Sequence, residues 1–355
     1  MEKKYPCVEV NLKKLTHNVK IILDMCNKRH IDVAGVTKVY CANIPIVETI
    51  LEAGVTLVAD SRILNLKKMK DLNCKKMLLR IPMISEASEV VEYSDCSLNS
   101  EIDTIVSLSE AAKKLNKIHN IILMVDLGDL REGVLTSGVV SIVSSIVKLD
   151  NIKLIGIGTN VTCYGGVIPD KKNLGDLINL KLEIEKKFDL DLPVISGGNS
   201  SSLYMVINNT IPGGVNQLRI GEAIVLGRET SYGKAIPNCY DDVFILRGEI
   251  VEIKSKPTLP TGTIGMDAFG NKPSFEDKGI RKRAIVAVGR QDIKLEGLTP
   301  LDNDVNIFGA SSDHLILDVT DSKKQLFVGS IVDFKIDYGC LLAAMTSPYV
   351  EKYYN

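Results

Sequence analysis

The chain has 355 residues, of which 45% are hydrophobic and 25% are charged, and its formal net charge is −1. This is ordinary globular composition at a length that fits one large barrel or two domains. Balanced charge without a basic patch argues against a nucleic-acid partner. No apolar run reaches the roughly 20 residues that span a bilayer, and the polar amino terminus has no signal-peptide core. We therefore expect a cytoplasmic protein with no membrane partner.

The cysteines carry little information. All eight are scattered and none forms a CxxC pair. Such spacing supports neither a zinc site nor a disulfide framework. We expect reduced thiols and no metal.

The first part of the chain alternates apolar runs of strand length with helical patterns. The helical patterns cover 15–25, 43–54, 61–70, 101–115, 139–149, 172–188 and 200–208. Strands are predicted at 33–37, 57–59, 76–81, 95–98, 121–125, 153–158, 193–195 and 217–220. Eight strands alternating with helices are typical of a (β/α)8 TIM barrel. This α/β barrel is assigned to residues 12–235.

After about residue 235 the pattern changes to strands joined by turns without long helices. The strand-like runs are 243–254, 284–288, 306–308, 314–319 and 330–336. They predict a smaller all-β C-terminal domain over residues 236–355, which residues 1–11 join as a strand. The segment 255–278, rich in Pro, Gly, Asp and Thr, is expected to be a long loop.

The first barrel strand ends in a lysine, Lys38. Barrel chemistry sits on the loops after the carboxyl ends of the strands. An apolar surrounding disfavours the ammonium form, and a neutral amine is the form that makes a Schiff base with a carbonyl compound. The alternative is that this lysine simply reaches solvent.

Residues at the ends of other strands indicate a site that binds an anion. The Gly/Ser-rich stretch 196–202 follows the seventh strand and opens a helix, at the usual phosphate position of a barrel. Arg219, at the end of the eighth strand, could bind the anion, face a cofactor ring or form a surface ion pair. Arg131, after the fifth strand, suits a substrate carboxylate. Together with Lys38 these groups indicate a phosphorylated aldehyde, and pyridoxal phosphate is the obvious candidate.

At these positions the chain resembles the alanine racemase family of fold-type III pyridoxal phosphate enzymes, and most closely its ornithine racemase branch. The resemblance makes Lys38 the Schiff-base lysine, points Arg219 at the pyridine nitrogen and places Arg131 at the substrate carboxylate. The cofactor contacts it implies are Lys38, Tyr40, Asn160, Ser196, Asn199, Ser200, Arg219, Gly221 and Tyr338. The substrate contacts it implies are Arg131, Ser312 and Asp313.

The chain also departs from the family pattern. The catalytic tyrosine of the family's Gly-Tyr-Ala-Asp turn is replaced by Arg290, and a guanidinium is effectively always protonated. We take His314 as the candidate for the second catalytic base, because the histidine side chain as a residue type changes its charge near physiological pH. It could instead be a strand histidine that points away, which would leave Asp292 or Cys163. Asn160 replaces a family histidine, and Met124 stands where many relatives carry a modified lysine that supports the arginine.

The leading interpretation is a racemase that interconverts L- and D-ornithine, or another basic amino acid, through a Schiff base and two-base proton transfer. The resemblance implies a homodimer with shared active sites. Asp129, Glu132 and Asp292 are the acids that could pair with a side-chain ammonium of the substrate. The alternatives are a pyridoxal phosphate carrier, an alanine or broad-specificity racemase, and an aldolase or decarboxylase on the same fold.

Overall fold

The computed structural model describes residues 3–267, 269–270 and 272–355. The chain divides into two compact units, here called the barrel unit (Lys13–Asp241) and the β unit (Met1–Leu12 with Asp242–Asn355). The β unit is therefore built from both ends of the chain.

Parallel strands close into a barrel. Within the described residues these are β2 Asp32–Val36, β3 Leu57–Asp60, β4 Lys75–Leu78, β5 Cys96–Asn99, β6 His119–Asp126, β8 Ile152–Gly158, β9 Val194–Ser196 and β10 Gln217–Ile220. Bonded neighbours run in the order β5-β4-β3-β2-β10-β9-β8-β6, and pairing of β5 with β6 closes the ring. A short strand, β7 (Val134–Leu135), adds to the end of β6. The predicted barrel is confirmed.

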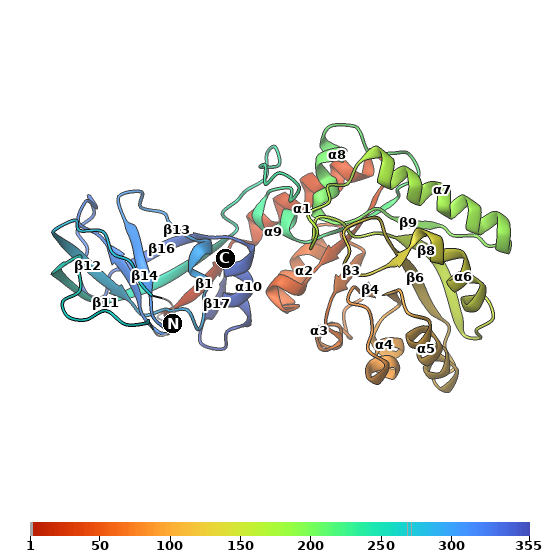
Figure 1. Ribbon diagram of the computed structural model, residues 1–355, viewed down its shortest axis with the longest axis horizontal. Coiled ribbons are helices and arrows are strands. Elements are labelled where there is room, and N and C mark those ends of the chain that lie inside the picture. Colours follow the sequence, from red (N-terminus) through yellow and green to blue (C-terminus); the bar gives the residue numbers. More distant parts are fainter. Residues whose placement is uncertain (1–2, 268, 271) are drawn as a thin grey trace. The chain divides into compact units, whose positions relative to one another are not determined.

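Helices follow the strands and surround the barrel (Figure 1). Their bounds are α1 Leu12–Asn27, α2 Ile44–Glu52, α3 Ile63–Lys68, α4 Ala87–Tyr93, α5 Ile102–Lys114, α6 Thr136–Ile146, α7 Lys171–Phe188, α8 Leu203–Ile207 and α9 Glu222–Leu226, with short 3-10 turns η1 Lys38–Tyr40, η2 Ile84–Glu86 and η3 Ser200–Ser202. The sequence pattern does not predict α4 and α9, because helices of seven and five residues are too short to display a period.

Apolar side chains from the strands fill the barrel interior. The packed cluster contains Ala34, Val36, Ala59, Met77, Cys96, Leu98, Ile122 and Met124. Met124 is fully buried there, so its apolar side chain offers no polar support to Arg131. A filled interior leaves the strand ends as the place where functional groups can gather.

The β unit holds one antiparallel sheet path with additions at its edge. Its strands are β1 Cys7–Val10, β11 Phe244–Pro257, β12 Ile280–Val286, β13 Leu298–Pro300, β14 Asn306–Ala310, β15 Leu315–Asp318, β16 Ile331–Ile336 and β17 Glu351–Tyr354. They run in the order β13-β16-β11-β12-β15-β14, and β1 pairs with β11 and with β17. The unit also contains the 3-10 turn η4 (Leu295–Gly297) and one helix, α10 (Tyr338–Thr346). A strand-only prediction omits α10 because its apolar residues show no clear face.

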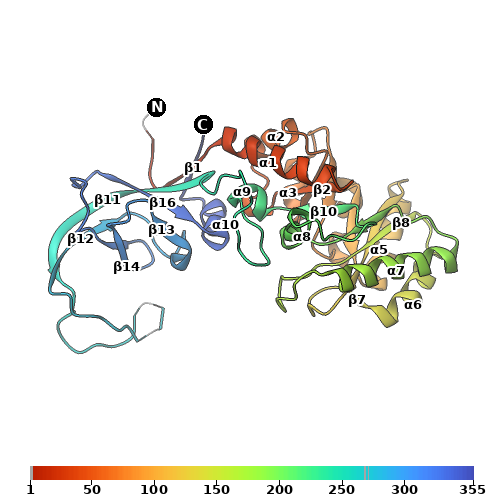
Figure 2. The same cartoon turned by 90° about the horizontal axis from the view of Figure 1, so that it is seen from above.

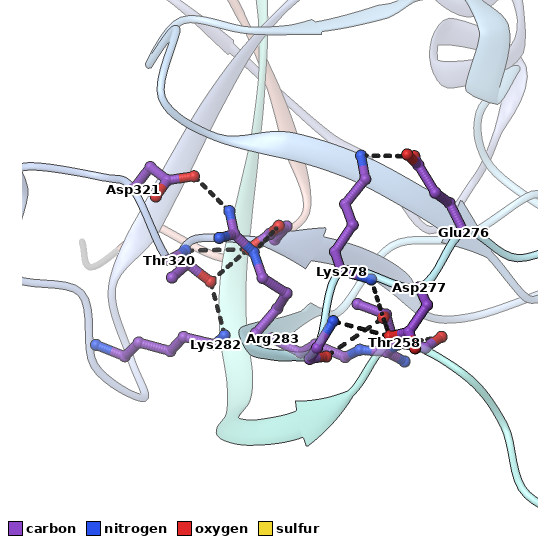
Figure 3. Close-up of polar contacts among 11 residues, drawn as sticks. Thr258, Glu276, Asp277, Lys278, Lys282, Arg283, Thr320 and Asp321 are labelled. Carbon is purple, nitrogen blue, oxygen red and sulfur yellow. Dashed lines mark hydrogen bonds and ion pairs between the residues drawn. The ribbon is translucent and has the colours of Figure 1, made fainter.

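The connection between β11 and β12 leaves the sheet as a long loop (Figure 2). Its two ends are tied together where the Lys278 N–H donates to Thr258 Oγ1 at 2.8 Å and the Thr258 N–H donates to the Gly279 carbonyl at 3.0 Å. Beside this junction the Lys282 N–H donates to Thr320 Oγ1 at 2.7 Å, as Figure 3 shows. The loop therefore begins and ends at a fixed point of the sheet.

Candidate active site

The turn that carries Lys38 is braced by a buried carboxylate. Thr37 Oγ1 donates to Asp60 Oδ2 at 2.6 Å, and Asp60 also accepts from the Arg62 N–H and from Asn65 Nδ2. Burial raises the pKa of Asp60 even though these hydrogen bonds act to lower it. The brace joins the carboxyl ends of β2 and β3. It fixes the start of η1, where Lys38 stands with its side chain exposed, so the expected apolar surrounding is not present in this chain.

Tyr40 ends the same turn but lies in a different environment. Its side chain is fully buried, and burial raises the pKa of its phenol. The hydroxyl is therefore a neutral group packed beneath the mouth.

The Gly/Ser-rich stretch after β9 forms a compact polar cradle. Asn199 caps η3 by accepting the Ser201 N–H at 2.8 Å, and Ser200 Oγ accepts the N–H groups of Gly221 and Ala223 at 3.4 and 3.3 Å. Gly221 must be small, because a Cβ there would lie 3.0 Å from Cβ of Val36. Ser201 Oγ is buried in this cradle without a hydrogen-bond partner among the described residues. Unpaired buried donors of this kind are what a phosphate oxygen would satisfy.

Arg219 is buried next to the cradle and its guanidinium contacts only neutral acceptors among the described residues. It donates to Ser196 Oγ, to the Thr159 carbonyl at 2.7 Å and to Asn160 Oδ1 at 3.4 Å. Burial lowers its pKa to about 10, and the negative charge of Glu132 acts against that shift. A buried cation without a bonded carboxylate fits the side of an uncharged ring nitrogen, which can accept from it.

Hydrogen bonds connect Arg131 to the same region. Arg131 is paired with Glu132, and Glu132 Oε1 also accepts from Asn160 Nδ2 at 3.1 Å. Asn160 Oδ1 in turn accepts from Asn199 Nδ2 at 2.8 Å. The structure thus joins Arg131, Asn160 and Arg219 with Asn199 and Ser196 in one polar network across the ends of β6, β8, β9 and β10. Lys38 and Tyr40 belong to the turn after β2 and have no hydrogen bond to this network among the described residues.

Asp129 has a different role from the one that its position suggested. It is buried, and its carboxylate accepts the backbone N–H groups of Thr162, Cys163, Tyr164 and Val167 at 2.9–3.2 Å. Burial acts to raise its pKa, but these N–H groups prevail and hold it below the usual value. Its oxygens are occupied, which argues against Asp129 as the partner of a substrate ammonium. It instead ties the loop after β6 to the loop after β8.

Cys163 lies within reach of the mouth charges. Desolvation raises the pKa of its thiol, and the positive charges of Arg131 and Lys38 act in the opposite direction. Asn199 Nδ2 also donates to Cys163 Sγ at 3.3 Å. The charge of Lys38 is therefore close enough to influence the thiol of Cys163.

Four of the predicted residues of the β unit, Arg290, Ser312, Asp313 and His314, lie at two facing turns. The Arg290 N–H donates to the Ser311 carbonyl at 2.9 Å, and the Gln291 N–H donates to the Ser312 carbonyl at 3.1 Å. Gly289 permits this approach, because a Cβ there would lie 2.1 Å from the Ser312 carbonyl oxygen. Ser312 Oγ donates to Asp313 Oδ2 at 2.8 Å, and His314 beside them is exposed.

Arg290 is held on several sides. Its Nη1 pairs with Glu296 Oε1 at 3.2 Å, its Nε donates to the Ala310 carbonyl at 3.3 Å, and its guanidinium lies 5.3 Å from the Phe269 ring centroid. Tyr338 is the first residue of α10, behind the cap residue Asp337, which accepts the Cys340 N–H.

A cavity of about 550 Å³ adjoins these turns in the β unit. Its apolar part is lined by Pro6, Val251, Ala287 and Val288, and its polar part by Gln291, Asp292, Asp313 and His314. Asp292 is buried and accepts from Ser347 Oγ at 2.6 Å. One oxygen of this carboxylate is thus hydrogen-bonded within the β unit itself.

The residues at the barrel mouth fit pyridoxal phosphate. The exposed amine of Lys38, the partly unpaired cradle and the buried Arg219 are the groups that the cofactor's aldehyde, phosphate and ring would need. Within the described ranges no cluster of metal-binding side chains occurs. No helix in the same ranges combines the length and apolar character needed to cross a membrane.

Fold and site define a cofactor-binding barrel joined to a β unit, and the comparisons name its family. Residues 10–229 match the family described as "Alanine racemase, N-terminal domain". The chain is 51% identical to the ornithine racemase of Acetoanaerobium sticklandii, over 98% of this chain and 99% of that one. It is 42% identical to the lysine racemase of Thermotoga maritima, over 99% of each. The solved alanine racemase of Bartonella henselae, with covalently bound pyridoxal phosphate, is 16% identical with a TM-score of 0.74, covering 99% of this chain and 100% of that one.

The chain belongs to the alanine racemase family. It is a pyridoxal-phosphate-dependent amino-acid racemase, as the resemblance implied. The racemase relatives span essentially the full chain, β unit included, which does not favour the carrier alternative.

Several important groups were not singled out as site residues by the sequence. Asp60 supports the Lys38 turn, and the hydroxyls of Ser201 and Thr159 are buried without described partners. Glu132 was considered only as a partner of the substrate. Its adjacency to Arg131 was a usable signal, but neighbouring side chains rarely converge unless the backbone turns between them.

Proposed function

We propose that the chain interconverts L- and D-ornithine. The observation that carries this substrate is the 51% identity with an ornithine racemase over nearly the whole chain. Lysine is the second candidate, because the lysine racemase is 42% identical over a similar span. The two amino acids differ by one methylene, which is worth only about 1–3 kcal/mol of discrimination. We therefore expect turnover of both, with ornithine preferred.

The proposed roles at the barrel mouth use the groups described above. Pyridoxal phosphate supplies an electron-withdrawing ring that acidifies the α-proton of a bound amino acid. Lys38 carries the proton on one face, and Arg131 binds the substrate carboxylate. Arg219 lies against the ring nitrogen, and Asn199, Ser200 and the Gly221 N–H surround the phosphate. Ser196 and Asn160 hold the Arg219 guanidinium in place.

Racemisation needs a second proton carrier on the opposite face, and we assign it to His314. The common location of Arg290, Asp313 and His314 at one pair of turns supports this assignment. Arg290, paired with Glu296, acts as an electrostatic anchor. We further propose a homodimer in which each site takes residues from both chains. The exposure of Lys38 in the single chain supports a partner that covers it. Tyr338 as a phosphate ligand and the cytoplasmic location also remain proposals.

The test of the substrate is chiral chromatography of L-ornithine, L-lysine and L-alanine, each incubated separately with protein and cofactor. We expect D-ornithine to accumulate fastest and D-alanine to be negligible. Turnover of alanine at the rate of ornithine would contradict a site built for a basic side chain.

A further inference from the structure

We infer that Glu132 is a positioning residue that holds Arg131 ready for the substrate carboxylate and couples it to the cofactor side of the site. The inference rests on the proposed role of Arg131.

Glu132 holds the guanidinium along one edge only. Its Oε2 pairs with Arg131 Nε, and its Oε1 accepts from Arg131 Nη2 at 2.7 Å. Within the described part of the chain, Glu132 is the one residue that accepts a hydrogen bond from the Arg131 side chain. A guanidinium has five N–H donors in a fixed fork. The end of the fork formed by Nη1 and Nη2 therefore stays open to a second carboxylate, which can bind it bidentately.

The backbone is shaped to make neighbouring side chains converge. Leu130 has φ of +55°, in the left-handed region that non-glycine residues rarely adopt. Gly133 has φ of +134°, and a Cβ there would lie 2.5 Å from the Asp126 nitrogen. The two unusual residues bracket Arg131 and Glu132. A surface ion pair between adjacent residues would not need such a turn.

Glu132 also reaches the network beneath the cofactor. Its Oε1 accepts from Asn160 Nδ2 at 3.1 Å, and Asn160 Oδ1 accepts from Arg219 Nη2 at 3.4 Å. Glu132 thus carries a negative charge bonded directly to Arg131, and this charge also opposes the lowering of the Arg219 pKa by burial. Glu132, acting through Asn160, therefore links the arginine proposed for the substrate carboxylate to the arginine proposed for the ring.

The test compares two ligands that differ by a carboxylate. In the holoenzyme, binding of L-ornithine and of 1,4-diaminobutane is titrated through the change in the cofactor's absorbance. Glu132→Gln keeps the size but presents an amide in place of one oxygen, so it cannot accept both Arg131 donors. We expect the Kd of ornithine to rise about tenfold, as expected for one weakened charge-assisted contact, and that of the diamine to change less than twofold.

A matched control is available on the outer surface of the barrel. Glu185 of α7 also has a cation partner, Lys181 at 3.0 Å, and a second donor, the Leu192 N–H at 2.9 Å. Its side chain is 20% exposed, against 21% for Glu132. Glu185→Gln is therefore expected to leave both dissociation constants unchanged.

The inference is overturned if Glu132→Gln weakens the binding of both ligands equally, or the binding of neither. If Glu132→Gln does not fold, Glu132→Asp, which keeps the charge but has a shorter reach, carries the same test. Selective loss of ornithine affinity supports the inference, and loss for both ligands or for neither overturns it. If the unmodified enzyme does not racemise ornithine, the proposed substrate fails separately, and the comparison is made with lysine and 1,5-diaminopentane.

Discussion

Replacement of Arg219 by methionine should weaken the binding of the cofactor. It should leave the apo-protein almost as stable as before. Lowering of the arginine pKa from 12.5 to about 10 corresponds to roughly 3 kcal/mol of burial cost. Methionine removes that cost. Ser196 Oγ keeps its contact with Gln217 Oε1 at 2.8 Å, and Asn160 Oδ1 keeps Asn199 Nδ2. The main destabilising effect is the loss of the hydrogen bond that Arg219 donates to the Thr159 carbonyl, which costs about 1–3 kcal/mol of unfolding free energy.

The two terms nearly cancel, so the unfolding free energy of the apo-protein should change by less than about 2 kcal/mol. The proposed contact of Arg219 with the cofactor is charge-assisted, and its loss, at about 1.5–3 kcal/mol, predicts a cofactor Kd raised by about 10- to 150-fold. Denaturant unfolding of the apo-protein and titration with pyridoxal phosphate measure the two quantities. Arg247→Met, in the β unit, is the control for removal of a paired arginine. Large destabilisation of the apo-protein with an unchanged cofactor Kd would refute the reasoning.

Further predictions concern the amine, the second base, a mouth loop and pH. Lys38→Ala should abolish racemisation, and borohydride should fix the cofactor on Lys38 in the parent enzyme only; full activity of the variant would exclude the assignment. His314→Asn should stop racemisation while one enantiomer still exchanges its α-proton in D2O, whereas Arg290→Ala should mainly raise KM; racemisation at the parent rate in His314→Asn would place the second base elsewhere. Asp129→Asn should lower stability by about 1–3 kcal/mol, because the amide cannot accept the same set of backbone N–H groups; an unchanged melting temperature would contradict this. Burial lowers the pKa of His119 from 6.5 to about 4. As the pH falls, the unfolded chain therefore takes up this proton before the folded chain does, and the unfolding free energy should fall by roughly 3 kcal/mol between pH 6.5 and pH 4. The His119→Gln variant should lose that part of the pH dependence.

The barrel could be predicted because its signal is local. Each buried strand is a short apolar run such as 121–125, and the strand ends carry polar residues in the same order as the loops of the mouth. For that reason Lys38, Arg131 and Arg219 could be placed at or just after the carboxyl ends of strands. Short elements such as α4 could not, because two turns of helix show no period.

The partners of the site residues were not predictable in the same way. Whether Asp129 faces a substrate or four backbone amides depends on how the loops after β6 and β8 meet. The same holds for Glu132, whose second contact, Asn160, lies 28 residues away. Sequence position gives the type of group at the mouth, and the folded loops decide which groups remain available to a ligand.

The β unit cannot be completed until residues 351–354 have been synthesised. Strand β1 is parallel to β17, with Cys7 opposite Glu351 and Val10 opposite Tyr354, and it is antiparallel to the start of β11. The barrel unit is one continuous stretch and can fold while the ribosome is still adding the C-terminal third. During that interval the backbone groups of β1 have no partner strand and could pair with another chain. Slow translation after residue 241 would lengthen this exposure, and removal of residues 351–355 would leave one edge of β1 without a hydrogen-bonded neighbour.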